Sequence, residues 1–142
     1  MLKVLIADDS DSVRIILRDF LALRSGVEVC GEAVNGLEAV EKAKTLAPDL
    51  VLMDLAMPKM NGAEATSVLK QAMPELFVVL FTMYGENVGR QLASAIRVDA
   101  VLCKPNGLRE LNNVIDSVLG RSPAPSDPGP ESRRFRKRAA GS

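Results

Sequence analysis

Five side chains in this sequence carry groups that together could act on a phosphoryl group. Asp8 and Asp9 follow directly after an apolar run, and Asp54 ends another apolar run further along the chain. Thr82 and Lys104 stand at the ends of two more. Close carboxylates repel each other, and a divalent cation removes that repulsion. The set therefore predicts a metal site with a nucleophilic carboxylate, provided that the fold brings these residues together.

Mg2+ is the cation that suits this set, because it prefers a few carboxylates together with water. With Mg2+ bound, Asp54 is expected to attack the phosphorus while the ion neutralises the phosphoryl oxygens. Lys104 would add a second positive charge and Thr82 would donate a hydrogen bond, so the reaction depends on positioning and electrostatics. The chain contains no histidine, which excludes a histidine-based triad and histidine phosphorylation on this chain.

The elements that must position these residues alternate between strands and helices. Short apolar runs predict strands at Lys3–Ala7, Val27–Ala33, Leu50–Asp54, Leu76–Thr82 and Ala100–Cys103. Apolar residues spaced by three and four predict helices over residues 13–21, 37–47, 65–72, 88–96 and 108–118. This alternation favours an α/β fold, a doubly wound five-stranded parallel sheet with helices on both faces. The carboxyl ends of such strands share one edge, where ligands bind.

Each signal has a simpler interpretation when it is taken alone. An acidic pair before a helix is often part of a cap, and Ser10 or Asp11 can cap the first helix without any metal. Gly62, which follows the letters PKMN, is expected to serve a turn with positive φ rather than chemistry. The joint placement of three acids, a hydroxyl and an ammonium at the ends of the right strands favours a functional site over these simpler interpretations.

Composition and charge limit the kind of protein. The 142 residues suit one domain, and residues 121–142 carry six basic side chains against two acidic ones. That segment is rich in Pro, Ser and Gly, so we expect a folded domain over 1–120 and a disordered tail over 121–142. Cys30 and Cys103 lack metal-binding spacing and are expected to be buried, reduced thiols. With no long apolar run and no signal peptide, no membrane association and a cytoplasmic location are expected.

Four sequence blocks carry a resemblance to a known family. The letters VLIADDS, PDLVLMDLAMPKMNG, VVLFT and VLCKP occur in the order and spacing that such proteins show. Across residues 1–120 the chain resembles the receiver domain of bacterial two-component response regulators. It is most similar in pattern to receivers of LuxR-type regulators. The resemblance implies a (βα)5 flavodoxin-like receiver fold with strand order 2-1-3-4-5.

The resemblance also implies roles for the acidic residues. Asp54 would be the phosphoacceptor, receiving its phosphoryl group from a sensor histidine kinase. Asp8 and Asp9 would hold Mg2+ together with Asp54 and the backbone carbonyl of Ala56. The chain would thus be the phosphoacceptor of a two-component signalling system, and phosphorylation would control partner binding or dimerisation.

The switch that follows phosphorylation is implied in the same way. Thr82 and Lys104 would act as the switch pair, with a cis peptide bond between Lys104 and Pro105. Family members often carry an aromatic residue at the position of Val101, so the loop 83–87 is expected to transmit the switch in this chain. A homodimer would form through the face of the fourth helix, the fifth strand and the fifth helix.

Two alternatives share part of the pattern. A phosphatase of the haloacid dehalogenase type also uses an Asp nucleophile with Mg2+, but it requires a second acid at the position of Ala56. A flavodoxin-like nucleotide-binding module requires a glycine-rich loop after the first strand, and the letters ADDSDS contain no glycine. The sequence favours a receiver that catalyses only its own phosphorylation and dephosphorylation. No DNA-binding domain is expected on this chain, because about twenty Pro-rich residues follow the predicted domain.

Overall fold

A computed structural model of the protein describes residues 1–82, 98–103 and 107–121. The strands are β1 (Leu2–Ala7), β2 (Val27–Ala33), β3 (Leu50–Asp54), β4 (Phe77–Thr82) and β5 (Ala100–Cys103). They form one parallel sheet in the order β2-β1-β3-β4-β5. Both the predicted fold class and the predicted strand order are confirmed.

Four helices lie within the described residues, at α1 (Asp11–Ala22), α2 (Gly36–Leu46), α3 (Gly62–Ala72) and α5 (Gly107–Arg121). The helix predicted over residues 88–96 lies outside them. The described chain divides into two compact units after Leu108. In α5, Leu111 and Ile115 are buried, as their spacing of four residues predicts. None of the described helices combines the length and the apolar character that a membrane span requires.

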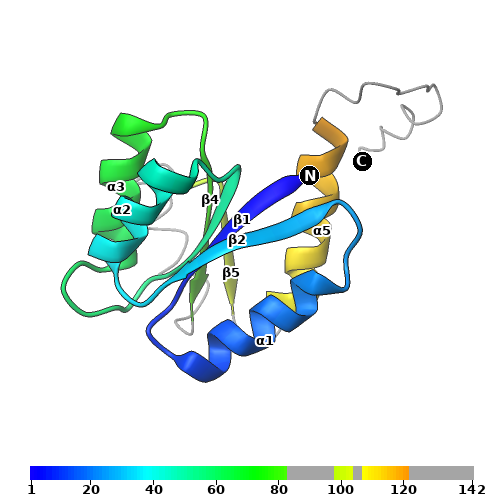
Figure 1. Ribbon diagram of the computed structural model, residues 1–142, viewed down its shortest axis with the longest axis horizontal. Helices are drawn as coiled ribbons and strands as arrows, with labels where there is room; N and C mark the ends of the chain where they lie inside the picture. Colours follow the sequence, from blue (N-terminus) through cyan, green and yellow to red (C-terminus); the bar gives the residue numbers. More distant parts are fainter. Residues whose placement is uncertain (83–97, 104–106, 122–142) are drawn as a thin grey trace. The chain divides into compact units, whose positions relative to one another are not determined.

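The central strands are buried on both faces, which explains why they read as continuous apolar runs. Every residue of β3 is buried. Figure 1 shows α2 and α3 side by side on one face of the sheet, and α1 on the other. The strand residues Leu5, Val51 and Leu80 belong to the same core cluster as Ala43 of α2 and Leu69 of α3. The sheet is therefore a rigid base for the residues at its carboxyl edge.

Two aspartates fix the beginnings of strands at the opposite edge. Asp49 precedes β3, and its Oδ2 accepts the backbone N–H of Lys3 in β1 at 2.8 Å. Asp99 precedes β5, and its Oδ2 accepts the backbone N–H of Val78 in β4 at 2.8 Å. The same oxygen of Asp99 accepts a hydrogen bond from the ammonium of Lys70 at 2.7 Å. Each acid thus ties its strand to a neighbour, which helps to set the register at the carboxyl edge.

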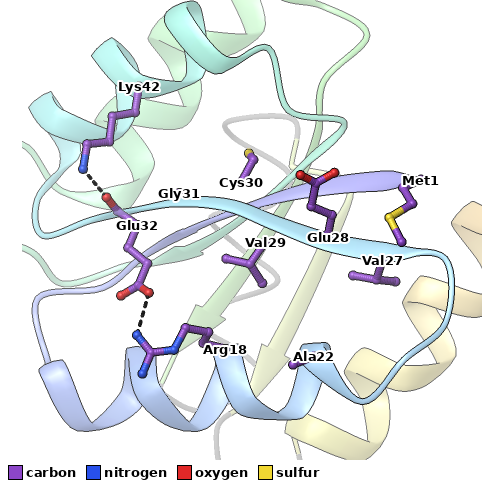
Figure 2. A pocket seen from close by; sticks show the side chains of 10 residues that line it. All are labelled: Met1, Arg18, Ala22, Val27, Glu28, Val29, Cys30, Gly31, Glu32 and Lys42. Carbon is purple, nitrogen blue, oxygen red and sulfur yellow. Dashed lines mark hydrogen bonds and ion pairs between the residues drawn. The ribbon is translucent and has the colours of Figure 1, made fainter.

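Strand β2 forms one edge of the sheet and contains a bulge. Val29 pairs with Val4, and Gly31 with Leu5, so Cys30 has no partner in the β1 register. An open hollow runs along this strand (Figure 2), lined by α1, β2 and Lys42 of α2. The Lys42 ammonium donates a hydrogen bond to the backbone carbonyl of Glu32 in β2. A bulge and a lysine are features that protect an edge strand from pairing with another chain.

Candidate metal and phosphoryl-transfer site

The topology of the sheet brings the three predicted acids together. Strands β1 and β3 are neighbours, and Ala7 pairs with Met53, so the next residues, Asp8 and Asp54, lie side by side. Asp8, Asp9 and Asp54 each offer a carboxylate oxygen, and these oxygens all lie within 4.8 Å of one another. Asp8 is 2% exposed and Asp54 7% exposed, whereas Asp9 is exposed. The cluster is thus open to solvent on the side of Asp9.

The donor set fits a hard divalent cation. Three carboxylate oxygens, two of them from buried residues, supply negative charge without any soft sulfur or nitrogen ligand in the cluster. Mg2+ typically takes one or two such carboxylates and completes its shell with water and phosphate oxygens. The exposed position of Asp9 leaves room for both. The residues present therefore fit the predicted ion.

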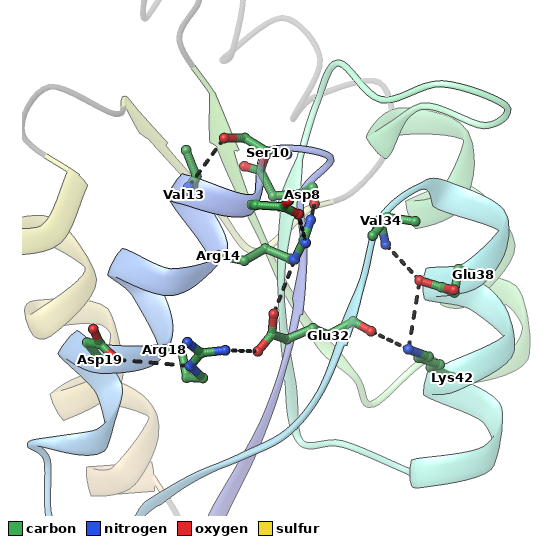
Figure 3. Close-up of polar contacts among 11 residues, drawn as sticks. Asp8, Ser10, Val13, Arg14, Arg18, Asp19, Glu32, Val34, Glu38 and Lys42 are labelled. Atoms are coloured by element: carbon green, nitrogen blue, oxygen red, sulfur yellow. Dashed lines mark hydrogen bonds and ion pairs between the residues drawn. The ribbon is translucent and has the colours of Figure 1, made fainter.

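The turn between β1 and α1 holds Asp8 from several sides. Its backbone N–H donates to the carbonyl of Ala33 in β2 at 3.0 Å. Its Oδ1 accepts the backbone N–H of Ser10 at 2.9 Å. Ser10 also caps α1, as expected, because its Oγ accepts the N–H of Val13 at 3.3 Å (Figure 3). The capping interpretation and the metal interpretation of this turn are thus compatible.

The switch pair is only partly within the described residues. Thr82 is the last residue of β4 and pairs in register with Cys103 of β5. Asp54 pairs with Phe81, so the backbone places Thr82 one residue beyond the neighbour of the acid. The side chain of Thr82 lies outside the described residues, as do Lys104 and Pro105 with the predicted cis bond, and the loop 83–87. The roles of Thr82 and Lys104 stay predictions.

The loop between β3 and α3 corrects the prediction for Gly62. This glycine is the first residue of α3, and its φ is not positive; the positive φ of this loop, 67°, belongs to Lys59. A Cβ on Gly62 would lie 2.2 Å from the carbonyl oxygen of Asp54. Glycine is needed here because the helix start approaches the end of β3 closely. Ala56 is exposed in the same loop, and the predicted role of its carbonyl as a metal ligand stays untested.

A repeated sequence element supports the site, and its role was not anticipated. The letters NGLEA and NGAEA begin α2 and α3. In both, the Asn side chain caps the helix by accepting the backbone N–H of the Glu three residues later. In both, the Gly allows close backbone approach, for Gly36 to the carbonyl of Met60. The sequence pattern that predicts these helix starts is Asn-Gly followed by a Glu at the third helical position.

The sheet, its helices and the acidic edge define a receiver of the flavodoxin-like class. The chain belongs to the family described as the response regulator receiver domain, which matches residues 4–116. Receivers of this family are the phosphoacceptors of two-component systems. The family that the sequence blocks predicted is thereby confirmed.

Known proteins resemble the chain over most of its length. It is 37% identical over 114 residues to the response regulator protein VraR of Staphylococcus aureus. That match covers 80% of this chain and 54% of VraR, so the chain spans about half of this relative. The response regulator domain of Thermotoga maritima CheB superposes with a TM-score of 0.75 at 29% identity, covering 90% of this chain and 99% of that chain. A CheX–CheY complex with BeF3 and Mg2+ from Borrelia burgdorferi gives 0.75 at 25% identity, covering 83% and 89%.

Proposed function

We propose that Asp54 accepts a phosphoryl group from the phosphohistidine of a sensor histidine kinase in a Mg2+-dependent reaction. The observation that carries this proposal is the set of three carboxylate oxygens within 4.8 Å, contributed by Asp8, Asp9 and Asp54 at the carboxyl edge of the sheet. It is supported by membership of the receiver family and by the BeF3 and Mg2+ named in the related CheX–CheY complex. A cytoplasmic location is part of the same proposal.

The proposed chemistry assigns a task to each acid. Asp8 and Asp9 would hold Mg2+, and Asp54 would supply a further oxygen. When bound, the ion neutralises charge on the phosphoryl oxygens. An oxygen of Asp54 attacks the phosphorus, the bond from phosphorus to the imidazole nitrogen breaks, and the electron pair stays on the imidazole. Lys104 and Thr82 are proposed to contact the transferred group through charge and hydrogen bonding.

The position of Ala56 favours a receiver over a phosphatase with turnover. A haloacid dehalogenase-type enzyme would require an acid there to protonate the leaving group and activate water. An alanine offers no proton, so we propose that the chain catalyses only its own phosphorylation and dephosphorylation. Phosphorylation would then control partner binding or homodimer formation.

The proposal is tested by incubating the full chain with acetyl phosphate and following the intact mass. Wild-type protein is expected to gain one phosphoryl group with Mg2+ and none with EDTA. Asp54→Asn is expected to gain none, while the control variant Asp19→Asn, which changes an exposed acid on α1, should label like the wild type. Labelling that persists at full stoichiometry in EDTA or in Asp54→Asn would contradict the proposal.

A further inference from the structure

Arg14 connects the turn that carries Asp8 and Asp9, here called the acidic turn, to Glu32 in β2 and to Asp11 in α1. Its Nη1 donates to the backbone carbonyl of Asp8 at 2.6 Å, and its Nε donates to Oε1 of Glu32 in β2 at 3.1 Å. Its Nη2 pairs with the carboxylate of Asp11 in the first turn of α1. The side chain is only 11% exposed. Figure 3 shows the guanidinium between the turn that carries Asp8 and the side chain of Glu32.

The contact with Asp8 affects both acids of the pair. The carbonyl that Arg14 holds belongs to the peptide group between Asp8 and Asp9. Because the Cα atoms of both residues lie in the plane of this group, holding the carbonyl restricts the orientation of both side chains. The carboxylate of Asp8 is held separately, through the N–H of Ser10 at 2.9 Å. Without the guanidinium, this peptide plane would lose its hydrogen bond to Arg14 and gain freedom to rotate.

Glu32 holds Arg14 in turn. One carboxylate oxygen of Glu32 accepts from Arg14, and the other accepts from Nη1 of Arg18 at 3.0 Å. Arg14 and Arg18 lie one helical turn apart on α1 and share this acid, and Arg18 also lies 3.9 Å from the carboxylate of Asp19. The two arginines thus share their charge and the partner Glu32, but Arg14 is more buried, at 11% exposed against 46%, and it carries the hydrogen bond to the carbonyl of Asp8.

We propose that Arg14 is a positioning residue of the Mg2+ site, anchored by Glu32 and acting through the carbonyl of Asp8. The inference rests on the proposed function, since it assumes that Asp8 and Asp9 hold the ion. Groups that orient metal ligands typically contribute factors of about 10–100 to metal affinity. A three-way planar fork is required, because Arg14 bonds three partners in different directions and a lysine ammonium lacks that geometry.

Charge and geometry predict opposite signs for Arg14. A guanidinium near a cation site repels the cation, so its removal through charge alone would tighten Mg2+ binding. If Arg14 positions the turn, its removal weakens Mg2+ binding in spite of the lost repulsion. The direction of the change therefore separates the two effects.

The experiment is isothermal titration calorimetry of the full chain with MgCl2 alone, on wild type, Arg14→Gln, Arg14→Lys and the matched control Arg18→Gln. Arg14→Gln is expected to raise the Kd for Mg2+ by about tenfold. Arg14→Lys lacks the planar fork but keeps the charge that repels the cation, so it is expected to raise Kd at least as much as Arg14→Gln. Arg18→Gln loses the same charge and the same partner, Glu32, and is expected to leave Kd unchanged or lower it.

A second readout separates positioning from general loss of structure. At saturating Mg2+, the rate of labelling by acetyl phosphate in Arg14→Gln should match the wild type within about twofold, while the half-saturating Mg2+ concentration rises with Kd. An unchanged or lower Kd in Arg14→Gln, or an equal rise in Arg18→Gln, would overturn the inference and leave the proposed function standing. If Arg14→Gln fails to fold by circular dichroism, the Kd of Arg14→Lys decides, and an unchanged value overturns the inference. Wild-type protein that binds no Mg2+ would overturn both.

Discussion

At the scale of single residues, a role could be predicted for side chains at the ends of strands, but not for those that act through a partner marked by no sequence pattern. Asp8 and Asp54 could be predicted to lie at the same edge, because they stand at the carboxyl ends of two apolar strands of a parallel sheet. The role of Arg14 could not be predicted, because its partner Glu32 lies 18 positions away and either residue alone reads as a solvated surface charge. Gly62 was predicted as a turn glycine, yet it is required by a close approach to Asp54 that only the folded chain reveals.

Replacing Gly62 by alanine should destabilise the protein through a steric clash. The new Cβ would lie 2.2 Å from the carbonyl oxygen of Asp54, so the start of α3 or the end of β3 must move. We expect a loss of about 1–3 kcal/mol in the free energy of unfolding, measured by urea denaturation. Gly120→Ala is the matched control in a helix, because a Cβ there meets nothing within 4 Å. Equal effects of the two substitutions would refute the clash.

The thiol of Cys30 provides a pH-dependent prediction. Burial raises the pKa of Cys30 above its ordinary value, and the nearby charge of Lys3 opposes this only in part. The side chain is half-buried, not fully buried as the sequence predicted. In a Cys103→Ser background, alkylation of Cys30 by iodoacetamide should therefore begin at higher pH in the folded protein than in urea. Stability should fall as pH rises through the ordinary thiol pKa, since the unfolded chain ionises first. Alkylation that begins at a lower pH in the folded protein than in urea would contradict this prediction.

At the scale of elements, the apolar runs predicted the strands and the family resemblance implied their order. The hydrogen bonds that Asp49 and Asp99 make to neighbouring strands could not be predicted. Apolar runs predict buried strands, and β3 is buried throughout. Asp49 and Asp99 look like ordinary loop acids in the sequence. Each accepts a backbone N–H from a neighbouring strand, of Lys3 and Val78 respectively, and such pairs over tens of residues leave no local pattern to read.

Asp99→Ala should weaken the junction between β4 and β5. The Lys70 side chain is 10% exposed and would lose its carboxylate partner, retaining the carbonyl of Leu76 at 2.7 Å. The N–H of Val78 would lose its acceptor as well. We expect a loss of about 2–3 kcal/mol in the free energy of unfolding, measured by thermal denaturation. Asp19→Ala, which removes an exposed acid 3.9 Å from Arg18, should cost less than about 0.5 kcal/mol. A cost for Asp99→Ala as small as that of Asp19→Ala would rule out the junction role.

At the scale of the whole molecule, the alternation of strands and helices was enough to predict a parallel sheet and to place the acids at one edge. The end of the last helix and the change in composition indicate where the domain ends, which we propose to be near Gly120. Helix α5 continues to Arg121, and the family match ends at residue 116. The composition changes at that point from mixed to rich in Pro, Ser and Gly.

A chain ending at Arg121 should therefore retain the stability of the full chain. The removed segment has little apolar surface to bury. We expect the melting temperatures of the two chains to agree within about 2 °C, which corresponds to well under 1 kcal/mol for a domain of this size. A markedly lower melting temperature for the short chain would show that residues after 121 stabilise the receiver.

The most direct test of the central claim is to locate the phosphoryl group on the chain. Protein treated with acetyl phosphate and Mg2+ is reduced with sodium borohydride, which converts an aspartyl phosphate into homoserine with release of phosphate. Tandem mass spectrometry of the peptides then identifies the converted residue. The account predicts homoserine at position 54, absent when Mg2+ is withheld. Conversion at Asp8 or Asp9 with position 54 unchanged would contradict it.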